Sequence, residues 1–309
     1  MFTGNSIAAS CHGKIILLGE HSVVYGYPSL ARPVKSLNIT TRVAKAFRGS
    51  TVTTYDYHGS YTELTREFGG IKSIIVALQD MVGARAANFS MSFQSNIPME
   101  RGLGSSAAIS VSTTKALASF WKIDLGKEKL IQIANAAETI NHGSASGLDV
   151  ATVLSDSTLA FTKAEGPSYI ANDLGAYLII GDTGIKGNTR EAVTLVRDET
   201  NSDAKAVEAI EDLGSIAQRG IAAWQGKDVE TFGALMDQAQ GDLSYLKVSS
   251  PELDALVKAA KANGALGAKL SGGGLGGVMI ALAKDGPTAD RIRTALLAHD
   301  AKGVWIDRI

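Results

Sequence analysis

The sequence predicts a fold of mixed helices and strands. Its 309 residues are 45% apolar, which allows a sizeable core in one large domain or two modest ones. Apolar residues occupy every second position from Phe89 to Phe93, as in a strand with one buried face. Between Ala107 and Trp121 they recur at roughly helical spacing instead. The stretch that joins these two elements, Pro98 to Ala108, contains paired glycines and serines and is the strongest candidate for a functional site.

The first half of the chain contains further elements of both kinds. Ile15 to Leu18 is a short, continuous apolar run, which is typical of a buried strand. Arg48-Gly49-Ser50 separates two β-rich runs and resembles a hairpin connection. We therefore expect strands at 15–18, 37–46, 51–57 and 88–94, and helices at 69–82, 107–121 and 127–141.

The second half follows the loop Glu165-Gly166-Pro167, where we place a domain boundary. The predicted domains are residues 1–167 and 168–309. Tyr177 to Gly184 is a buried strand that ends in a turn, and the glycine-rich run Lys269 to Gly277 leads into a strand rather than a helix. We expect strands at 157–162, 278–283 and 303–308, and helical segments at 189–225, 228–246, 251–263 and 288–299.

The loop before residue 107 has the chemistry of an anion site. Gly102 and Gly104 let the backbone turn sharply, and Ser105 or Ser106 can cap the helix that follows. The first amides of a helix have no intrahelical acceptor, and the helix dipole places partial positive charge there. We infer that residues 102–108 hold the phosphates of a nucleotide.

Other interpretations of this loop compete. It could be an ordinary loop with a capped helix. Gly102, Gly104 and Ala107 also fit the dinucleotide fingerprint G-x-G-x-x-A, but residues 97–101 separate them from the preceding strand, whereas that fingerprint follows its strand directly. A Walker P-loop is excluded, because Gly13-Lys14 is followed by Ile15 and Gly226-Lys227 by Asp228.

Several charged residues lie at the ends of apolar runs. Lys14 precedes the strand at 15–18, and Glu20 and His21 follow it, as at the rim of a cleft, although a solvated turn would explain the latter two as well. Glu138 lies near the C-terminal end of a predicted helix, so it either faces water or has a cationic partner such as a metal ion. Asp149 stands between Leu148 and Val150, where it serves either as a functional carboxylate or as a helix cap.

Composition excludes several classes of partner. The net charge is −1 with no run of like charge, so neither nucleic-acid binding nor a polybasic membrane patch is implied. No apolar run approaches the ~20 residues of a membrane span. The single cysteine, Cys11, excludes an internal disulfide and suits a reducing compartment, so we expect a cytoplasmic protein.

Four segments in this order resemble the GHMP kinase superfamily, and within it the mevalonate kinase family. They are Gly13 to Gly26, Pro98 to Ala108, His142 to Asp149, and Lys269 to Gly277. Gly19-Glu20-His21, followed by Val23-Val24-Tyr25-Gly26, fits this family better than the galactokinases, the phosphomevalonate kinases or the mevalonate diphosphate decarboxylases. The chain is short for the family, which indicates a bacterial-type or archaeal-type member.

The resemblance implies an α+β architecture of two lobes, with the active site in the cleft between them. The N-terminal lobe would resemble a ribosomal-protein fold with a left-handed βαβ crossover, an exception to the usual handedness. The C-terminal lobe would be ferredoxin-like. Sequence pattern alone does not predict that handedness.

The resemblance also implies a reaction and its residues. The family transfers a phosphoryl group from ATP to the 5-hydroxyl of mevalonate, with Mg²⁺ as cofactor. Asp149 would accept the hydroxyl proton and Lys14 would keep that carboxylate ionised. Ser106, or Ser105, and Glu138 would hold Mg²⁺. Mevalonate would contact Lys14, Glu20, His21, Asp149, Thr183 and Gly273. The ATP site would comprise Pro98, Arg101, Gly102, Leu103, Gly104, Ser105, Ser106, Ala107 and Ala108.

Rival functions remain open at this point. Homoserine kinase and galactokinase share the phosphate-handling residues and differ in the acceptor pocket. The argument for an NAD-dependent oxidoreductase rests on Gly102-x-Gly104-x-x-Ala107. A non-catalytic ATP-binding regulator is disfavoured, because Lys14, Glu138 and Asp149 are all present. The sequence leaves the oligomeric state open, with a homodimer as one option.

Overall fold

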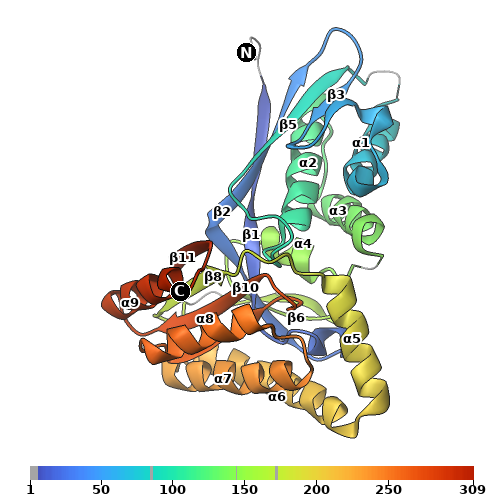
Figure 1. Cartoon of the computed structure of the whole chain (residues 1–309). Coiled ribbons are helices and arrows are strands. Elements are labelled where there is room, and N and C mark those ends of the chain that lie inside the picture. Colours follow the sequence, from blue (N-terminus) through green and yellow to red (C-terminus); the bar gives the residue numbers. More distant parts are fainter. Residues whose placement is uncertain (1–5, 84–85, 144, 171–172) are drawn as a thin grey trace. The chain divides into compact units, whose positions relative to one another are not determined.

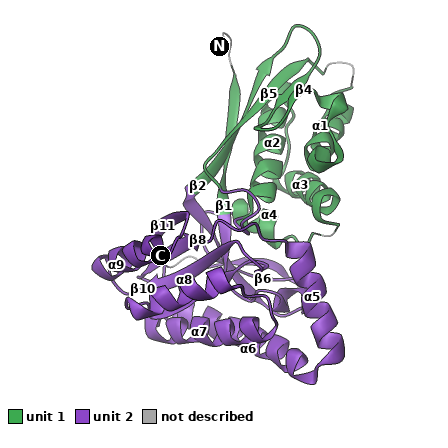
Figure 2. Cartoon of the chain, in the orientation of Figure 1, with its two compact units in different colours: residues 1–13, 37–97, 104–154 green, residues 14–36, 98–103, 155–309 purple. Residues whose placement is uncertain are grey.

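The computed structural model describes residues 6–83, 86–143, 145–170 and 173–309 (Figure 1). The chain forms two compact units, coloured separately in Figure 2. Unit 1 comprises residues 1–13, 37–97 and 104–154, and unit 2 comprises residues 14–36, 98–103 and 155–309. Among the described residues, none of the helices is both long enough and apolar enough to span a bilayer.

A twisted sheet supplies the strands of unit 1. Its order is β4 (His58–Ser60), β3 (Thr51–Thr53), β5 (Phe89–Ser95) and β2 (Ser29–Lys45), and β1 (Ile7–Leu18) pairs with β2. Strands β1 and β2 also contribute residues to unit 2. The sequence-based expectation for residues 51–57 is too long, because β3 ends at Thr53 and β4 follows.

The predicted hairpin at Arg48-Gly49-Ser50 is wrong. β5 lies between β2 and β3: it is antiparallel to β2, with Lys45 opposite Phe89, and parallel to β3, with Thr51 opposite Ser90. A short polar connection allows a hairpin but does not require one, because pairing is decided by which strands bury their apolar faces together. Here β3 returns to β5 through α1, which makes the parallel crossover of this unit.

Helices cover one side of this sheet. α1 (Gly69–Val82) has the predicted bounds, α2 (Ser105–Trp121) follows the glycine loop, and α3 (Lys127–His142) and the short α4 (Leu148–Val153) complete the unit. Two 3₁₀ turns, η2 (Tyr61–Glu63) and η3 (Arg66–Phe68), precede α1. The core joins apolar side chains of the sheet and of α1 to α3, including Val43, Ile75, Phe89, Leu117 and Ile133. The predicted helix pattern therefore places the correct faces inward.

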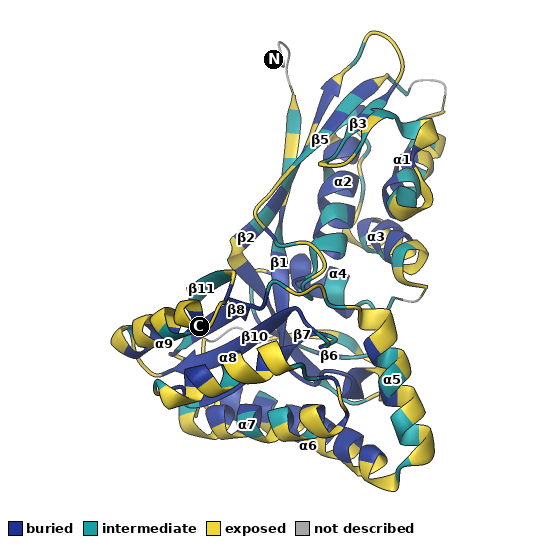
Figure 3. Ribbon diagram, viewed as in Figure 1, coloured by how far each residue is buried: buried dark blue, intermediate teal, exposed yellow. Residues whose placement is uncertain are grey.

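A four-stranded antiparallel sheet organises the described part of unit 2. Its order is β11 (Gly303–Arg308), β8 (Tyr177–Asp182), β10 (Val278–Ala283) and β9 (Gly267–Ser271). Numbered within this sheet, that order is 4-1-3-2 with helices after the first and third strands, which is the βαββαβ ferredoxin-like arrangement. β10 is buried along its whole length, as its continuous apolar sequence predicts (Figure 3).

The described part of unit 2 contains further elements, two of which are strands that pair with β2 and with each other rather than with this sheet. These elements are η1 (Ser22–Tyr25), β6 (Leu159–Thr162), β7 (Gly166–Tyr169), α5 (Thr189–Ser202), α6 (Ala204–Gln225), α7 (Val229–Tyr245), α8 (Pro251–Ala262) and α9 (Gly286–Ala298). Asp203, Asp228, Ser250 and Asp285 each cap the next helix by accepting a backbone N–H, and a cap of this kind contributes about 1 kcal/mol. α6 and α7 pack through Trp224 and Phe232, whose rings meet edge to face at 5.4 Å.

Candidate active site

The first part of the glycine loop, residues 98–103, belongs to unit 2. Gly102 has φ of +79°, a conformation that costs glycine little, and a Cβ there would lie 3.4 Å from the Ser271 carbonyl oxygen. The next residue, Leu103, accepts a hydrogen bond from the backbone N–H of Lys14 at 2.9 Å. The loop therefore lies close to the glycine-rich turn after β9 and to the start of the buried part of β1.

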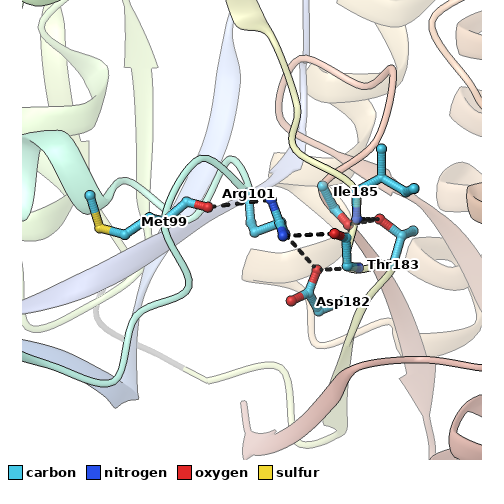
Figure 4. A network of polar contacts seen from close by, with 7 residues as sticks. Met99, Arg101, Asp182, Thr183 and Ile185 are labelled. Carbon is cyan, nitrogen blue, oxygen red and sulfur yellow. Dashed lines mark hydrogen bonds and ion pairs between the residues drawn. The ribbon is translucent and has the colours of Figure 1, made fainter. Parts of the chain in front are cut away.

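Arg101, an expected ATP contact, directs its guanidinium group toward the end of β8 (Figure 4). Its Nε donates to Asp182 Oδ1 at 3.1 Å, and Nη2 donates to the Gly184 carbonyl at 2.7 Å. Asp182 Oδ1 also accepts the backbone N–H of Gly184 at 2.9 Å. The guanidinium thus joins the loop to the turn that follows β8.

The second part of the loop begins α2 in unit 1. Gly104 is the N-cap, with φ of +70°, and no described side chain caps this helix. The expectation that Ser105 or Ser106 caps it is wrong, because both lie inside the first turn. The leading amides of α2 have no acceptor within the helix, which leaves a partially positive end suited to phosphate.

Glu138 of α3 lies in a cluster of polar side chains. The Ser106 hydroxyl donates to Glu138 Oε1 at 2.7 Å, and the Ser110 hydroxyl donates to the same oxygen at 2.9 Å. The Asn141 amide donates to Ser106 Oγ at 3.1 Å and accepts the backbone N–H of Gly70. Glu138 is only 5% exposed, and Nε2 of His142 lies 3.6 Å from its Oε2. The plainer alternative of a solvated helix end is therefore wrong.

The electrostatics of this cluster favour a cation. Burial raises the pKa of Glu138, the hydroxyls of Ser106 and Ser110 and the nearby His142 lower it, and the charge of Asp149 raises it further. Neutral hydroxyls offset a buried negative charge only in part. Hydroxyl and carboxylate oxygens are also the ligands that Mg²⁺ prefers, so Ser106 and Glu138 fit that ion.

Asp149 occupies the first turn of α4. Gly147, with φ of +88°, is the N-cap of this helix, so Asp149 lies beyond the cap rather than at it. Its side chain is half-buried, and its negative charge acts on Glu138 within unit 1. Two carboxylates with a serine-rich helix start make this part of unit 1 strongly polar.

The residues after β1 are buried in unit 2. The Glu20 carboxylate pairs with the ammonium group of Lys269 in β9, and both side chains are inaccessible to solvent. Lys269 also donates to the Leu270 carbonyl at 2.7 Å, whereas Glu20 Oε2 has no hydrogen-bond partner among the described residues. The solvated-turn interpretation of Glu20 and His21 is therefore wrong.

His21 adopts an unusual backbone conformation and is held by the glycine-rich turn. Its φ is +60°, and its Nε2 lies 3.0 Å from the Gly273 carbonyl oxygen. Burial, with a smaller contribution from the charge of Lys269, lowers the pKa of His21 to about 4, although the bond to Gly273 opposes the shift. His21 is therefore neutral at pH 7. Because Nε2 faces a carbonyl oxygen, the single ring proton is assigned to Nε2, which leaves Nδ1 as an acceptor.

Thr183 and the turn from Gly272 to Gly277 line the other side of unit 2's polar region. The Thr183 hydroxyl donates to the Gly277 carbonyl at 2.7 Å and accepts the backbone N–H of Ile185 (Figure 4). Gly274 has φ of +81°, and a Cβ there would lie 2.1 Å from the Val248 carbonyl oxygen, so the turn requires glycine. The hydroxyl of Thr183 is already used within this turn.

The structure thus collects the predicted residues into two groups. Unit 1 holds Gly104 to Ala108, Glu138 and Asp149, and unit 2 holds Lys14, Glu20, His21, Pro98 to Leu103, Thr183 and Gly273. Sequence reasoning missed the partners that orient them: Ser110, Asn141, Asp182 and Lys269. Helical spacing could have found two of these, because Ser110 lies four residues after Ser106 and Asn141 three after Glu138.

Comparison with known proteins identifies the family. The family model for the GHMP kinase N-terminal domain matches residues 70–157, and the C-terminal model matches residues 204–302. The chain is 32% identical to a mevalonate kinase of Aeropyrum pernix, over 90% of this chain and 89% of that one. It is 31% identical to a mevalonate kinase of Pyrococcus abyssi, over 90% and 88% of the two chains.

Solved structures agree with this fold. A mevalonate kinase from methicillin-resistant Staphylococcus aureus is 29% identical, with a TM-score of 0.76 over 99% of both chains. The Methanococcus jannaschii mevalonate kinase, at 23% identity, superposes with a TM-score of 0.85 over 99% of both chains and shares the fold. The chain therefore belongs to the mevalonate kinase family of the GHMP kinase superfamily.

Proposed function

We propose that this chain transfers the γ-phosphoryl group of ATP to the 5-hydroxyl of mevalonate, giving 5-phosphomevalonate and ADP. The observation that carries the proposal is the Ser106–Glu138 contact, which lies in the first turn of the helix that the glycine loop begins. A phosphate site with an oxygen-donor pair beside it suits a nucleotide bound with a divalent cation. The long matches to mevalonate kinases support the choice of acceptor.

Phosphoryl transfer depends mainly on positioning and on offsetting charge. In the proposed site, the amides of residues 102–108 bind the β- and γ-phosphates. Ser106 and Glu138 would hold Mg²⁺, which when bound offsets negative charge on the phosphates. Ser106 is the better candidate of the two serines, because its Oγ is fixed between Glu138 and Asn141.

The acceptor requires a base and a cation. We propose that Asp149 accepts the proton of the 5-hydroxyl. Lys14, which is 4% exposed and held through its backbone to Leu103, supplies a positive charge that favours the alkoxide over the alcohol.

The remaining proposed contacts of mevalonate are Glu20, His21, Thr183 and Gly273. A neutral His21 with Nδ1 as acceptor suits a hydroxyl better than a carboxylate. Glu20 has one oxygen committed to Lys269 and a second oxygen that can accept. A relative from L. major, 24% identical with a TM-score of 0.83, was crystallised in complex with R-mevalonate.

Other GHMP kinases are the rival assignment, because a galactokinase of Lactococcus lactis shares the fold with a TM-score of 0.83 at 17% identity. An ADP-release assay with mevalonate, homoserine and galactose side by side separates them. We expect kcat/KM for mevalonate to exceed the others by at least ~10²-fold, as expected when buried polar groups select their substrate. Comparable turnover of homoserine or galactose would contradict the proposal.

Location and assembly are further proposals. The buried Cys11 thiol, whose pKa burial raises to about 11, is unreactive and compatible with a reducing cytoplasm. A homodimer is the proposed assembly, and sedimentation equilibrium would distinguish it from a monomer.

A further inference from the structure

Residues 98–103 are tied to the segment that follows β8 by the Arg101 side chain, by a backbone bond and by an exposed ion pair between Glu100 and Lys186. The Arg101 guanidinium binds both Asp182 and the Gly184 carbonyl, and the backbone N–H of Gly187 donates to the Glu100 carbonyl at 2.8 Å. Figure 4 shows the guanidinium directed into this turn. The Arg101 side chain is 15% exposed and that of Asp182 is 8% exposed, so the ion pair is largely shielded from water.

The anchored residues adjoin the proposed phosphate contacts. Gly102 and Leu103 follow Arg101 directly, and the Leu103 carbonyl accepts the backbone N–H of Lys14. A displacement of Arg101 would therefore move the Gly102 and Leu103 amides and the backbone to which Lys14 is tied. Small displacements of this kind are costly for phosphoryl transfer, which relies on orientation.

We propose that Arg101 is a positioning residue: its ion pair with Asp182 and its bond to Gly184 hold the loop in the conformation that binds nucleotide phosphates. This inference rests on the proposed function only in taking the loop as the phosphate site. The alternative is that Arg101 binds a phosphate directly. A direct contact would not require Asp182, whose charge repels a phosphate, whereas positioning requires Asp182 as much as Arg101.

Substitutions of the pair distinguish the two roles. Arg101→Lys keeps the charge but loses the planar fork that reaches Asp182 and Gly184 together. Asp182→Asn keeps the shape and removes the charged acceptor. We expect each variant to raise KM and Kd for ATP about tenfold, as follows from loss of a charged hydrogen bond. The double variant should lose no more than the worse single variant, because both changes break the same interaction.

The control is another ion pair between the same two segments. Lys186 Nζ lies 2.5 Å from Glu100 Oε2, but these side chains are 74% and 56% exposed. Lys186→Gln should leave the Kd for ATP within about twofold, because exposed ion pairs contribute little.

The measurements are ATP titration by calorimetry and initial-rate kinetics on the full chain, with circular dichroism to verify folding. Wild-type affinity in both Arg101→Lys and Asp182→Asn, or additive losses in the double variant, would overturn the inference. Should Asp182→Asn fail to fold, Arg101→Gln replaces it: positioning predicts that the Lys and Gln variants are equally impaired, whereas a direct charge contact predicts that Lys retains affinity. Binding of ATP without phosphorylation of mevalonate would instead contradict the proposed acceptor alone.

Discussion

At the scale of single residues, the buried pair Glu20–Lys269 shows how the site combines function with stability. Burial raises the pKa of Glu20 and lowers that of Lys269, while the attraction between them opposes both shifts. Neither group has access to water, so each depends on the other. The sequence identified Glu20 by its motif but not its partner, because the two residues are 249 positions apart.

Removing one member of this pair should be strongly destabilising. Lys269→Met leaves a buried carboxylate without its cation, and we expect a loss of ~3–5 kcal/mol in the free energy of unfolding. Glu20→Gln combined with Lys269→Met should recover part of the loss, because no charge then remains. Urea denaturation of the wild type, the single variant and the double variant measures their free energies of unfolding. Lys284→Met, in the exposed pair with Glu230, is the control and should cost no more than ~1 kcal/mol.

Asp149 carries the chemical prediction at this scale. Asp149→Asn preserves shape but removes the charge and basicity of the proposed base. We expect kcat to fall at least ~10²-fold, as for loss of a general base, with the Kd for ATP nearly unchanged. Steady-state kinetics and ATP titration provide the two values. Asp156→Asn, an exposed aspartate after α4, is the matched control and should behave as wild type. Retention of more than about a tenth of kcat in Asp149→Asn would reject the base assignment.

At the scale of elements, local pattern predicted helices well and strand pairing poorly. The apolar stripe of α1 predicted the bounds of this helix correctly, because contacts within a helix are local. The bounds of β11 were also predicted correctly, because Gly303 marks its start and the sequence ends just after Arg308. The β2–β3 hairpin was wrong because β5, which begins only at Phe89, occupies the position between them. Pairing of that kind depends on the tertiary core, which no short window contains.

The α6–α7 pair offers a test of electrostatics away from the site. Asp242 of α7 is half-buried and shares a surface groove with Asp212 of α6, while the neighbouring Arg219 is bonded to Gln238. Burial, with the charge of Asp212, raises the pKa of Asp242 from 3.8 to about 6. The folded state therefore binds more protons than the unfolded state between these values, and stability falls as the pH rises through about 6.

Asp242→Asn removes the group that is costly to ionise. We expect the variant to melt at a higher temperature than wild type at pH 8, and the difference to disappear near pH 4, where Asp242 is protonated in the folded state. Thermal unfolding followed by circular dichroism at both pH values tests this. Glu211→Gln, one residue before Asp212 and exposed, controls for the change in net charge. An equal gain at both pH values in Asp242→Asn would contradict the assignment.

At the scale of the whole molecule, the two units do not correspond to two uninterrupted stretches of sequence. The predicted domains divide the chain once, near residue 167, and this division stays a proposal. Unit 2, however, takes residues 14–36, 98–103 and 155–167 from the first of these domains. The sequence placed each motif in order, but it did not show which motifs pack together. Only the fold showed this, through the contacts of β9 with Ile16 in β1 and with Glu20 after β1.

This interleaving predicts that residues 168–309 will not fold alone. The fragment lacks Glu20, so Lys269 would be buried without its partner, at a cost of ~3–5 kcal/mol. It also lacks Arg101, the partner of Asp182, and the Ile16 carbonyl that accepts the Ser271 hydroxyl at 2.7 Å. We expect no cooperative thermal transition for the fragment. Adding residues 1–167 should restore one, because all these partners return.

The control retains every contact and breaks only the chain. A protease site placed in the exposed turn at residues 163–165, between β6 and β7, gives a cleaved protein of the same composition. Because surface turns tolerate cleavage, this protein should still unfold cooperatively. A cooperative transition and dispersed amide resonances in the isolated fragment 168–309 would show instead that its own core suffices, and that the buried partners from the first half of the chain serve the site rather than the fold.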